Sequence, residues 1–161
     1  MTASYSVLFV CLGNICRSPL AEAAFRQEIE RLALKIEVDS AGIGRWHAGE
    51  PPDKRAQRIA LRNGIDISTY RARQVKKEDF HRFTHVVALD SENLEALEAM
   101  KPSAAMAQIT LLLDHAEGRK GEAVADPYYG GEAGFEITWA DVTAGARGLA
   151  ARLAKPDDNA R

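Results

Sequence analysis

The chain has 161 residues, a formal net charge of −2, 46% hydrophobic and 27% charged side chains, which is the size and composition of one globular domain. Its near-balanced charge excludes the strongly basic footprint of a nucleic-acid-binding protein. Two cysteines are too few for the disulfide framework of a small secreted domain, and no apolar run approaches the roughly 18 residues that cross a bilayer. We therefore expect one domain over residues 1–161, in the cytoplasm, without membrane insertion or a nucleic-acid partner.

Strands and helices alternate along the first half of the predicted chain. A buried strand is expected at residues 5–10, and a helix whose first turn contains Pro19 is expected to run to Leu32. A second strand at 35–40 leads into a Gly- and Pro-rich loop at 41–52. Asp53 is a suitable N-cap for a further helix, which ends at Arg62 before Asn63 and Gly64.

The second half continues the alternation. The pattern predicts a strand at 84–89, a helix from Asp90 to Met100, a strand at 109–113, a long loop at 121–134, a helix at 135–153 and a frayed tail at 155–161. This order is typical of an α/β fold, a doubly wound, flavodoxin-like, four-stranded parallel sheet with helices on both faces. Such sheets bind ligands beyond the carboxyl ends of their strands.

Cys11 and Arg17, with five residues between them, follow the first predicted strand at the carboxyl edge of the sheet. Backbone amides in a loop that ends at a helix start can surround a tetrahedral anion, while Arg17 can bind two of its oxygens. The helix start and the arginine favour a thiolate at Cys11, to which Ser18 can donate a hydrogen bond. The predicted anion-binding residues are Leu12, Gly13, Asn14, Ile15, Cys16, Arg17 and Ser18.

Other interpretations of this loop are weaker. Cys11 alone could be a small buried hydrophobic residue, and a thiolate in an anion site could serve a phosphatase, a reductase or a redox sensor. The loop lacks the glycines and lysine of the common nucleotide-binding motifs. The four histidines show no metal-ligand spacing, so we expect no metal.

The segment from Val10 to Pro19 resembles the signature of the low-molecular-weight protein tyrosine phosphatases. Further segments resemble the same family in the expected order along nearly the whole chain: Asp39-Ser40-Ala41-Gly42, Ala72-Arg73-Gln74, Glu78-Asp79-Phe80 and Ala125-Asp126-Pro127-Tyr128-Tyr129-Gly130. The resemblance implies hydrolysis of phosphotyrosine through a cysteinyl-phosphate, without a cofactor. Cys11 would be the nucleophile, Arg17 the phosphate clamp and Asp126 the general acid and then base.

The resemblance also implies supporting roles. Asn14 would turn an amide inward and be anchored by Ser40, although Ser40 could equally be a simple strand-end cap. Trp46, Tyr128 and Tyr129 would form aromatic walls of a slot that suits phosphotyrosine, while packing against the scaffold is nearly as good an account of Tyr129.

Cys16 and Tyr70 are the two positions at which the resemblance leaves questions open. Cys16 would form a reversible disulfide with Cys11 that protects the nucleophile, or else be a loop spacer. Tyr70 stands where relatives often carry a histidine that supports the loop. The chain lacks the further cysteines of an arsenate reductase and the Cys-x-x-Cys spacing of a thiol oxidoreductase. It also retains the nucleophile and acid that a silent phosphotyrosine-binding module would have lost.

The partner that the resemblance implies is a phosphotyrosine protein, with a tyrosine kinase as one candidate. We expect the protein itself to be a monomer or a weak homodimer.

Overall fold

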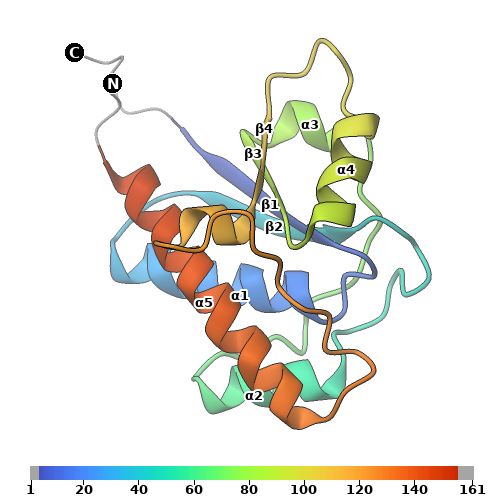
Figure 1. The fold of residues 1–161 in the computed structure, drawn as a ribbon, viewed down its shortest axis with the longest axis vertical. Coiled ribbons are helices and arrows are strands. Elements are labelled where there is room, and N and C mark those ends of the chain that lie inside the picture. Colours follow the sequence, from blue (N-terminus) through green and yellow to red (C-terminus); the bar gives the residue numbers. More distant parts are fainter. Residues whose placement is uncertain (1–3, 156–161) are drawn as a thin grey trace.

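The fold is built around a parallel sheet in a computed structural model that describes residues 4–155. The described residues form four strands, β1 (Ser6–Cys11), β2 (Glu37–Gly42), β3 (His85–Ala88) and β4 (Gln108–Leu111), in the order β2-β1-β3-β4. The helices are α1 (Arg17–Arg31), α2 (Lys54–Arg62), α3 (Asp79–Arg82), α4 (Ser91–Met100), the short 3₁₀ helix η1 (Leu112–His115) and α5 (Glu132–Ala154). The predicted α/β architecture is confirmed, with the sheet running between two helical layers (Figure 1).

Alternating side chains of β1 supply both halves of the core, because successive residues of a strand face opposite sides of a sheet. Val7 and Phe9 pack in one apolar cluster with residues of α1 and α5, whereas Leu8 and Val10 pack in a second cluster with Phe80 and Leu97. All four of these β1 side chains are fully buried. The strand is therefore held from both faces, and its carboxyl end at Cys11 is a rigid base for the loop that follows.

The structure corrects several predicted boundaries. The second strand covers Glu37–Gly42 instead of 35–40, because Ala41 and Gly42 pair with Val10 and Cys11. The last predicted strand stops at Leu111, because η1 begins at the next residue, and α5 starts three residues earlier than predicted, at Glu132. The short helix α3 had no prediction. Of the predicted tail, residues 156–161 lie outside the described residues.

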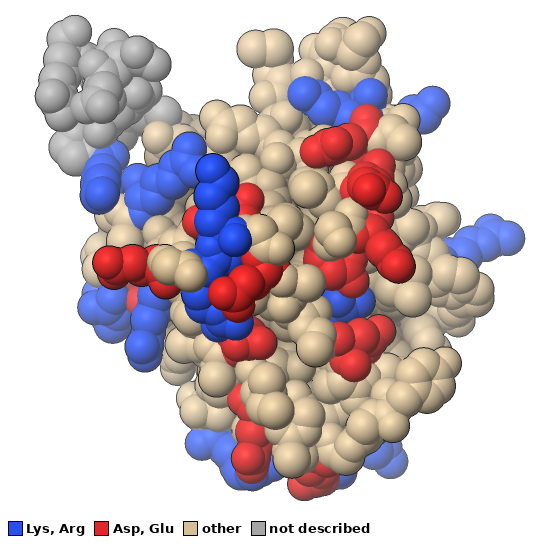
Figure 2. Space-filling model, viewed as in Figure 1, with Lys and Arg blue, Asp and Glu red and all other residues tan. Residues whose placement is uncertain are grey.

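Charged side chains of both signs are interspersed on the face drawn in Figure 2. Many of them pair at the surface, as Arg119 does with Glu122 and Asp141. Within residues 4–155, no helix is long and apolar enough to span a membrane.

Candidate active site

The loop between β1 and α1, residues 12–16, closes around the Cys11 sulfur, and we call it the anion loop after its predicted role. Cys11 is the last residue of β1 and is 3% exposed, and α1 begins at Arg17. Asn14 has a φ of 59°, in the left-handed region that asparagine tolerates better than most residues. This conformation directs the backbone N–H of Asn14 to the Cys11 Sγ, and the nitrogen lies 3.3 Å from the sulfur. A strand end and a helix start therefore hold a cysteine with the backbone amide of Asn14 directed at its sulfur.

A buried hydrogen-bond network fixes the loop from behind. The hydroxyl of Ser18 lies 3.0 Å from the Cys11 Sγ, and the Asn14 side-chain amide donates to Ser18 at 2.8 Å and to Ser40 at 3.0 Å. The Asn14 side-chain oxygen accepts the Arg73 amide at 3.0 Å. The structure thus brings together the three predicted supporting residues, Asn14, Ser18 and Ser40.

The network ends on a buried carboxylate. Ser40 donates to Glu22 at 2.8 Å, and Arg26 Nε donates to the other Glu22 oxygen at 2.8 Å. Burial raises the pKa of Glu22 despite these bonds. Tyr70 packs at the edge of the core cluster, and burial together with the Glu22 charge raises its pKa to about 12. Tyr70 is therefore a neutral phenol near neutral pH, and the positive charge beside Glu22 comes from Arg26.

Arg17 lies beneath the loop and is 3% exposed. Its Nη1 donates to Asp90 Oδ2 at 2.7 Å and to the Val124 carbonyl at 2.9 Å, while Nη2 lies 3.6 Å from Asp126 Oδ2. Burial alone would lower the pKa of Arg17, but the surrounding Cys11, Asp90 and Asp126 raise it above the usual value. The guanidinium is consequently a permanent cation beside the cysteine.

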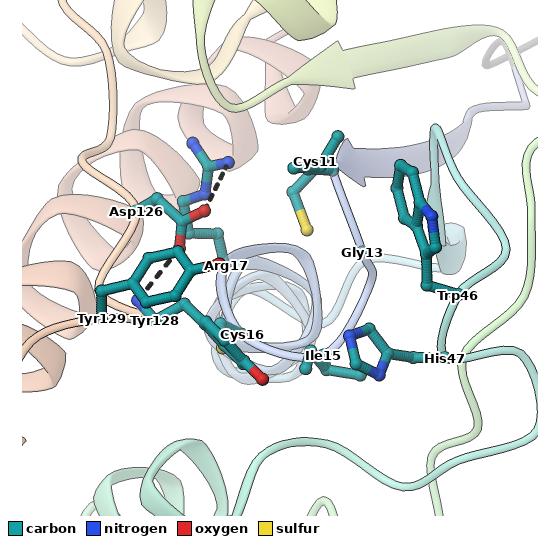
Figure 3. Close-up of a pocket in the computed structure, with 11 residues that line it drawn as sticks. Cys11, Gly13, Ile15, Cys16, Arg17, Trp46, His47, Asp126, Tyr128 and Tyr129 are labelled. Atoms are coloured by element: carbon teal, nitrogen blue, oxygen red, sulfur yellow. Dashed lines mark hydrogen bonds and ion pairs between the residues drawn. The ribbon is translucent and has the colours of Figure 1, made fainter.

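Asp126 enters the site from the loop before α5. Its Oδ1 accepts the Tyr128 amide at 3.0 Å, and 42% of its side chain is exposed. In Figure 3 the carboxylate lies beside Arg17 on one side of the pocket, and the sulfur of Cys11, a residue that is 3% exposed, points into the pocket. The structure therefore brings Cys11, Arg17 and Asp126 to one cavity, with the carboxylate nearer to solvent than the thiol.

The pocket has a volume of about 280 Å³ and aromatic sides. Trp46 and His47 face Tyr128 and Tyr129 across it (Figure 3). Trp46 is 70% exposed and Tyr129 is 96% exposed, while Tyr128 packs edge-on against Tyr129 at a ring distance of 5.0 Å. All three predicted wall residues line the pocket, and Tyr129 is not packed into the scaffold.

Two residues at the site had no predicted role. His47 lines the pocket, where its Nδ1 lies 2.6 Å from Glu50 Oε2. Asp90 was predicted only as the start of a helix, and it is the N-cap of α4 as well as the partner of Arg17. The position of Asp90 immediately after a strand, at the edge where ligands bind, is the sequence signal that points to it.

Cys16 is a further thiol of the loop. It is 4% exposed, and burial raises its pKa far above the usual range. Both Cys11 and Cys16 are free thiols. Residues 4–155 contain no group of three His, Cys, Asp or Glu side chains placed to hold a metal ion.

The fold and this site define a class of protein: an α/β domain with a cysteine- and arginine-containing anion loop after its first strand. The sequence model described as low molecular weight phosphotyrosine protein phosphatase matches residues 6–159. The chain belongs to the low molecular weight phosphotyrosine protein phosphatase family.

Individual relatives cover most of the chain. A phosphatase of this name from Schizosaccharomyces pombe is 44% identical over 138 residues, which is 84% of this chain and 88% of the relative. The phosphatase YfkJ of Bacillus subtilis is 44% identical over 152 residues, covering 93% of this chain and 96% of the relative. The crystal structure of YfkJ matches 93% of this chain and 94% of its own with a TM-score of 0.85 and 43% identity. A structure described as Drosophila arginine phosphatase has a TM-score of 0.88 and 30% identity, covering 94% of this chain and 99% of its own.

Proposed function

We propose that the protein hydrolyses phosphotyrosine on proteins through a covalent phosphate on Cys11, with residues 1–161 acting as one catalytic domain. The observation that carries this proposal is the convergence of Cys11, Arg17 and Asp126 in one aromatic-sided pocket. The membership of the chain in the phosphatase family supports it.

In the first step the Cys11 thiolate attacks phosphorus, a sulfur–phosphorus bond forms and the bond to the tyrosyl oxygen breaks. Protonated Asp126 gives its proton to the departing phenolate, so tyrosine leaves as a neutral phenol. The loop amides and the Arg17 guanidinium stabilise the negative charge on the equatorial phosphate oxygens. To do so, Arg17 Nη2, which lies 3.6 Å from Asp126, turns toward the phosphate.

In the second step the Asp126 carboxylate takes a proton from water while the water oxygen attacks phosphorus. The sulfur–phosphorus bond breaks, phosphate leaves and the Cys11 thiolate returns. The Ser18 hydroxyl, 3.0 Å from the Cys11 Sγ, can stabilise that departing thiolate. No metal or cofactor takes part in this sequence.

The shape of the pocket favours an aryl phosphate. Cys11 is almost fully buried, whereas Trp46 and Tyr129 are exposed above it. A flat tyrosyl ring can pass between such rings and still bring its phosphate to the sulfur, while the shorter side chain of phosphoserine cannot reach as far.

A substrate panel tests the proposal. In the presence of a chelator, we expect turnover of a phosphotyrosyl peptide to exceed turnover of the matched phosphoseryl and phosphoarginyl peptides by at least about 100-fold. The phosphoarginyl peptide is included because a solved structure with the same fold is described as an arginine phosphatase. A preference for either other peptide would contradict the proposed substrate class.

We further propose that Cys16 protects Cys11. Hydrogen peroxide would take two electrons and two protons from the Cys11 and Cys16 thiols, a sulfur–sulfur bond would form between them, and the peroxide would be reduced to two water molecules. A Cys16→Ser variant should keep its turnover, but it should no longer recover with dithiothreitol after peroxide treatment. Equal recovery of wild type and variant would leave Cys16 as a loop spacer.

The remaining proposals concern the cellular setting. We propose cytoplasmic action on phosphotyrosine proteins, a tyrosine kinase among them, by a monomer or weak homodimer. Capture of partners from the native lysate with an Asp126→Ala variant tests the substrate proposal, and a capture without phosphotyrosine proteins would contradict it.

A further inference from the structure

Arg55 connects the anion loop to the segment that carries Asp126. It lies in the first turn of α2, where it makes a two-pronged contact with Asp53: Nε donates to Oδ1 at 3.0 Å and Nη2 donates to Oδ2 at 2.9 Å. Asp53 is itself fixed, because it caps α2 and its amide donates to the Ile15 carbonyl of the anion loop at 2.8 Å. The Arg55 side chain is therefore anchored to a residue that is itself bonded to the anion loop.

The two terminal nitrogens of the same guanidinium also hold the loop after Asp126. Arg55 Nη2 donates to the Tyr128 carbonyl at 2.9 Å, and Nη1 donates to the Gly130 carbonyl at 2.7 Å. The guanidinium carbon also lies 4.7 Å from the ring centre of buried Phe135 in α5. Arg55 thus binds the loop on one side and the start of α5 on the other.

Apart from the buried side chain of Pro127, few contacts restrain this loop. Tyr129 is 96% exposed, and two further backbone hydrogen bonds are local: the Gly130 amide donates to the Pro127 carbonyl at 3.0 Å, and the Gly134 amide donates to the Gly131 carbonyl at 3.1 Å. Among the described residues, the hydrogen bonds that reach residues 126–131 from a segment distant in the sequence come from Arg55, alongside the Arg17–Asp126 ion pair at 3.6 Å. That ion pair must loosen when Arg17 turns to a phosphate, whereas the Arg55 contacts need not change.

We propose that Arg55 is a positioning residue for the general acid, a role that rests on the proposed function of Asp126. By holding the carbonyls of residues 128 and 130, Arg55 keeps the Tyr128 amide under Asp126 Oδ1, 3.0 Å away, and the carboxyl over the leaving-group oxygen. A planar, multidentate donor suits this task, because it grips two carbonyls and a carboxylate at once in a fixed geometry.

The test compares leaving groups. A positioned acid matters most when the departing phenolate is basic, so the kcat/KM of an Arg55→Gln variant should fall about tenfold for phenyl phosphate and less than about threefold for p-nitrophenyl phosphate. The matched control is Arg58→Gln one turn along α2, because Arg58 also joins α2 to α5 by bonding Glu132 at 2.8 Å but leaves the loop carbonyls alone. This control should behave as wild type on both substrates.

An Asp126→Asn variant distinguishes a failure of the general-acid role of Asp126 from a failure of the positioning role of Arg55. If the kcat/KM of Asp126→Asn falls by the same factor for both substrates, Asp126 is not the general acid. If Asp126→Asn shows the leaving-group dependence but Arg55→Gln does not, the positioning role of Arg55 is wrong. In the double variant, Arg55→Gln should add no leaving-group dependence to that of Asp126→Asn.

A conservative variant covers the case in which Arg55→Gln folds poorly. Arg55→Lys keeps the positive charge beside Asp53 but lacks the planar fork. It should show a smaller dependence on the leaving group in the same direction, together with faster hydrogen exchange of the amides at 128–131. An equal loss on both substrates with unchanged exchange would overturn the proposal.

Discussion

Asn14 meets two requirements of the anion loop: a left-handed backbone conformation and a side chain that forms buried hydrogen bonds. Its φ of 59° places the peptide in the left-handed region, and its side-chain amide bonds Ser18 and Ser40 while its oxygen accepts the Arg73 amide. Asn14 is 3% exposed, so these groups have no water to replace a lost partner. Alanine would meet neither requirement, whereas glycine would meet only the backbone requirement.

We predict a graded loss of stability at this position. Asn14→Gly should lower the free energy of unfolding by about 1 to 3 kcal/mol through the lost buried hydrogen bonds. Asn14→Ala should lower it by about a further 1 kcal/mol, because a β-carbon is strained at this φ. Urea unfolding of the two variants and wild type measures the difference. Equal values for glycine and alanine would show that the backbone conformation costs alanine nothing.

Local motifs predict a residue well when its partners are near in sequence. Cys11, Arg17 and Ser18 belong to one strand–loop–helix junction, so their convergence follows from the motif alone. Asp126 was placed through the family resemblance, since an Asp-Pro pair is by itself an ordinary turn. His47 and the Asp90–Arg17 contact went unpredicted, because they depend on how distant segments meet at one edge of the sheet.

Elements were predicted most accurately where capping chemistry marks their ends. The helix after Asp53 runs over Lys54–Arg62, and Gly64 beyond it has a φ of 85°. The helix after Asp90 likewise ends at Met100, before Pro102. Strand ends were less accurate, since pairing with a neighbour sets them: β2 reaches Gly42 because β1 continues beside it to Cys11. The four-residue helix α3 is too short for a periodic signal.

At the scale of the whole molecule, we expect buried His85 and partly buried His115 to make stability depend on pH. The Nε2 of His115 lies 2.9 Å from the Thr110 hydroxyl, and the Nδ1 of His85 lies 2.9 Å from the Thr84 hydroxyl. Burial and the nearby Arg152 charge lower the pKa of both, that of His115 to about 4. Between about pH 6.5 and pH 4 the unfolded chain therefore binds more protons at His115 than the native protein does, so acid favours unfolding.

We predict that the contribution of neutral His115 to the free energy of unfolding is fully present above pH 6.5 and is lost as the pH falls toward 4. Allowing for solvent screening of this partly exposed ring, His115 should account for about 1 kcal/mol of the loss between pH 7 and pH 5. Urea unfolding at both pH values should show a shallower pH dependence in His115→Gln. The exposed His81→Gln variant is the control and should keep the wild-type dependence. An unchanged dependence in His115→Gln would contradict the assignment.

The central claim is that phosphate passes through the Cys11 sulfur. Rapid acid quenching of the enzyme during turnover of a phosphotyrosyl peptide, followed by mass spectrometry of the proteolytic fragments, observes that intermediate directly. We predict one phosphoryl group on the fragment that contains Cys11, assigned to Cys11 and not to Cys16, and no label or turnover in a Cys11→Ser variant. Sustained turnover by Cys11→Ser, or a phosphoryl group on a different residue, would contradict the account.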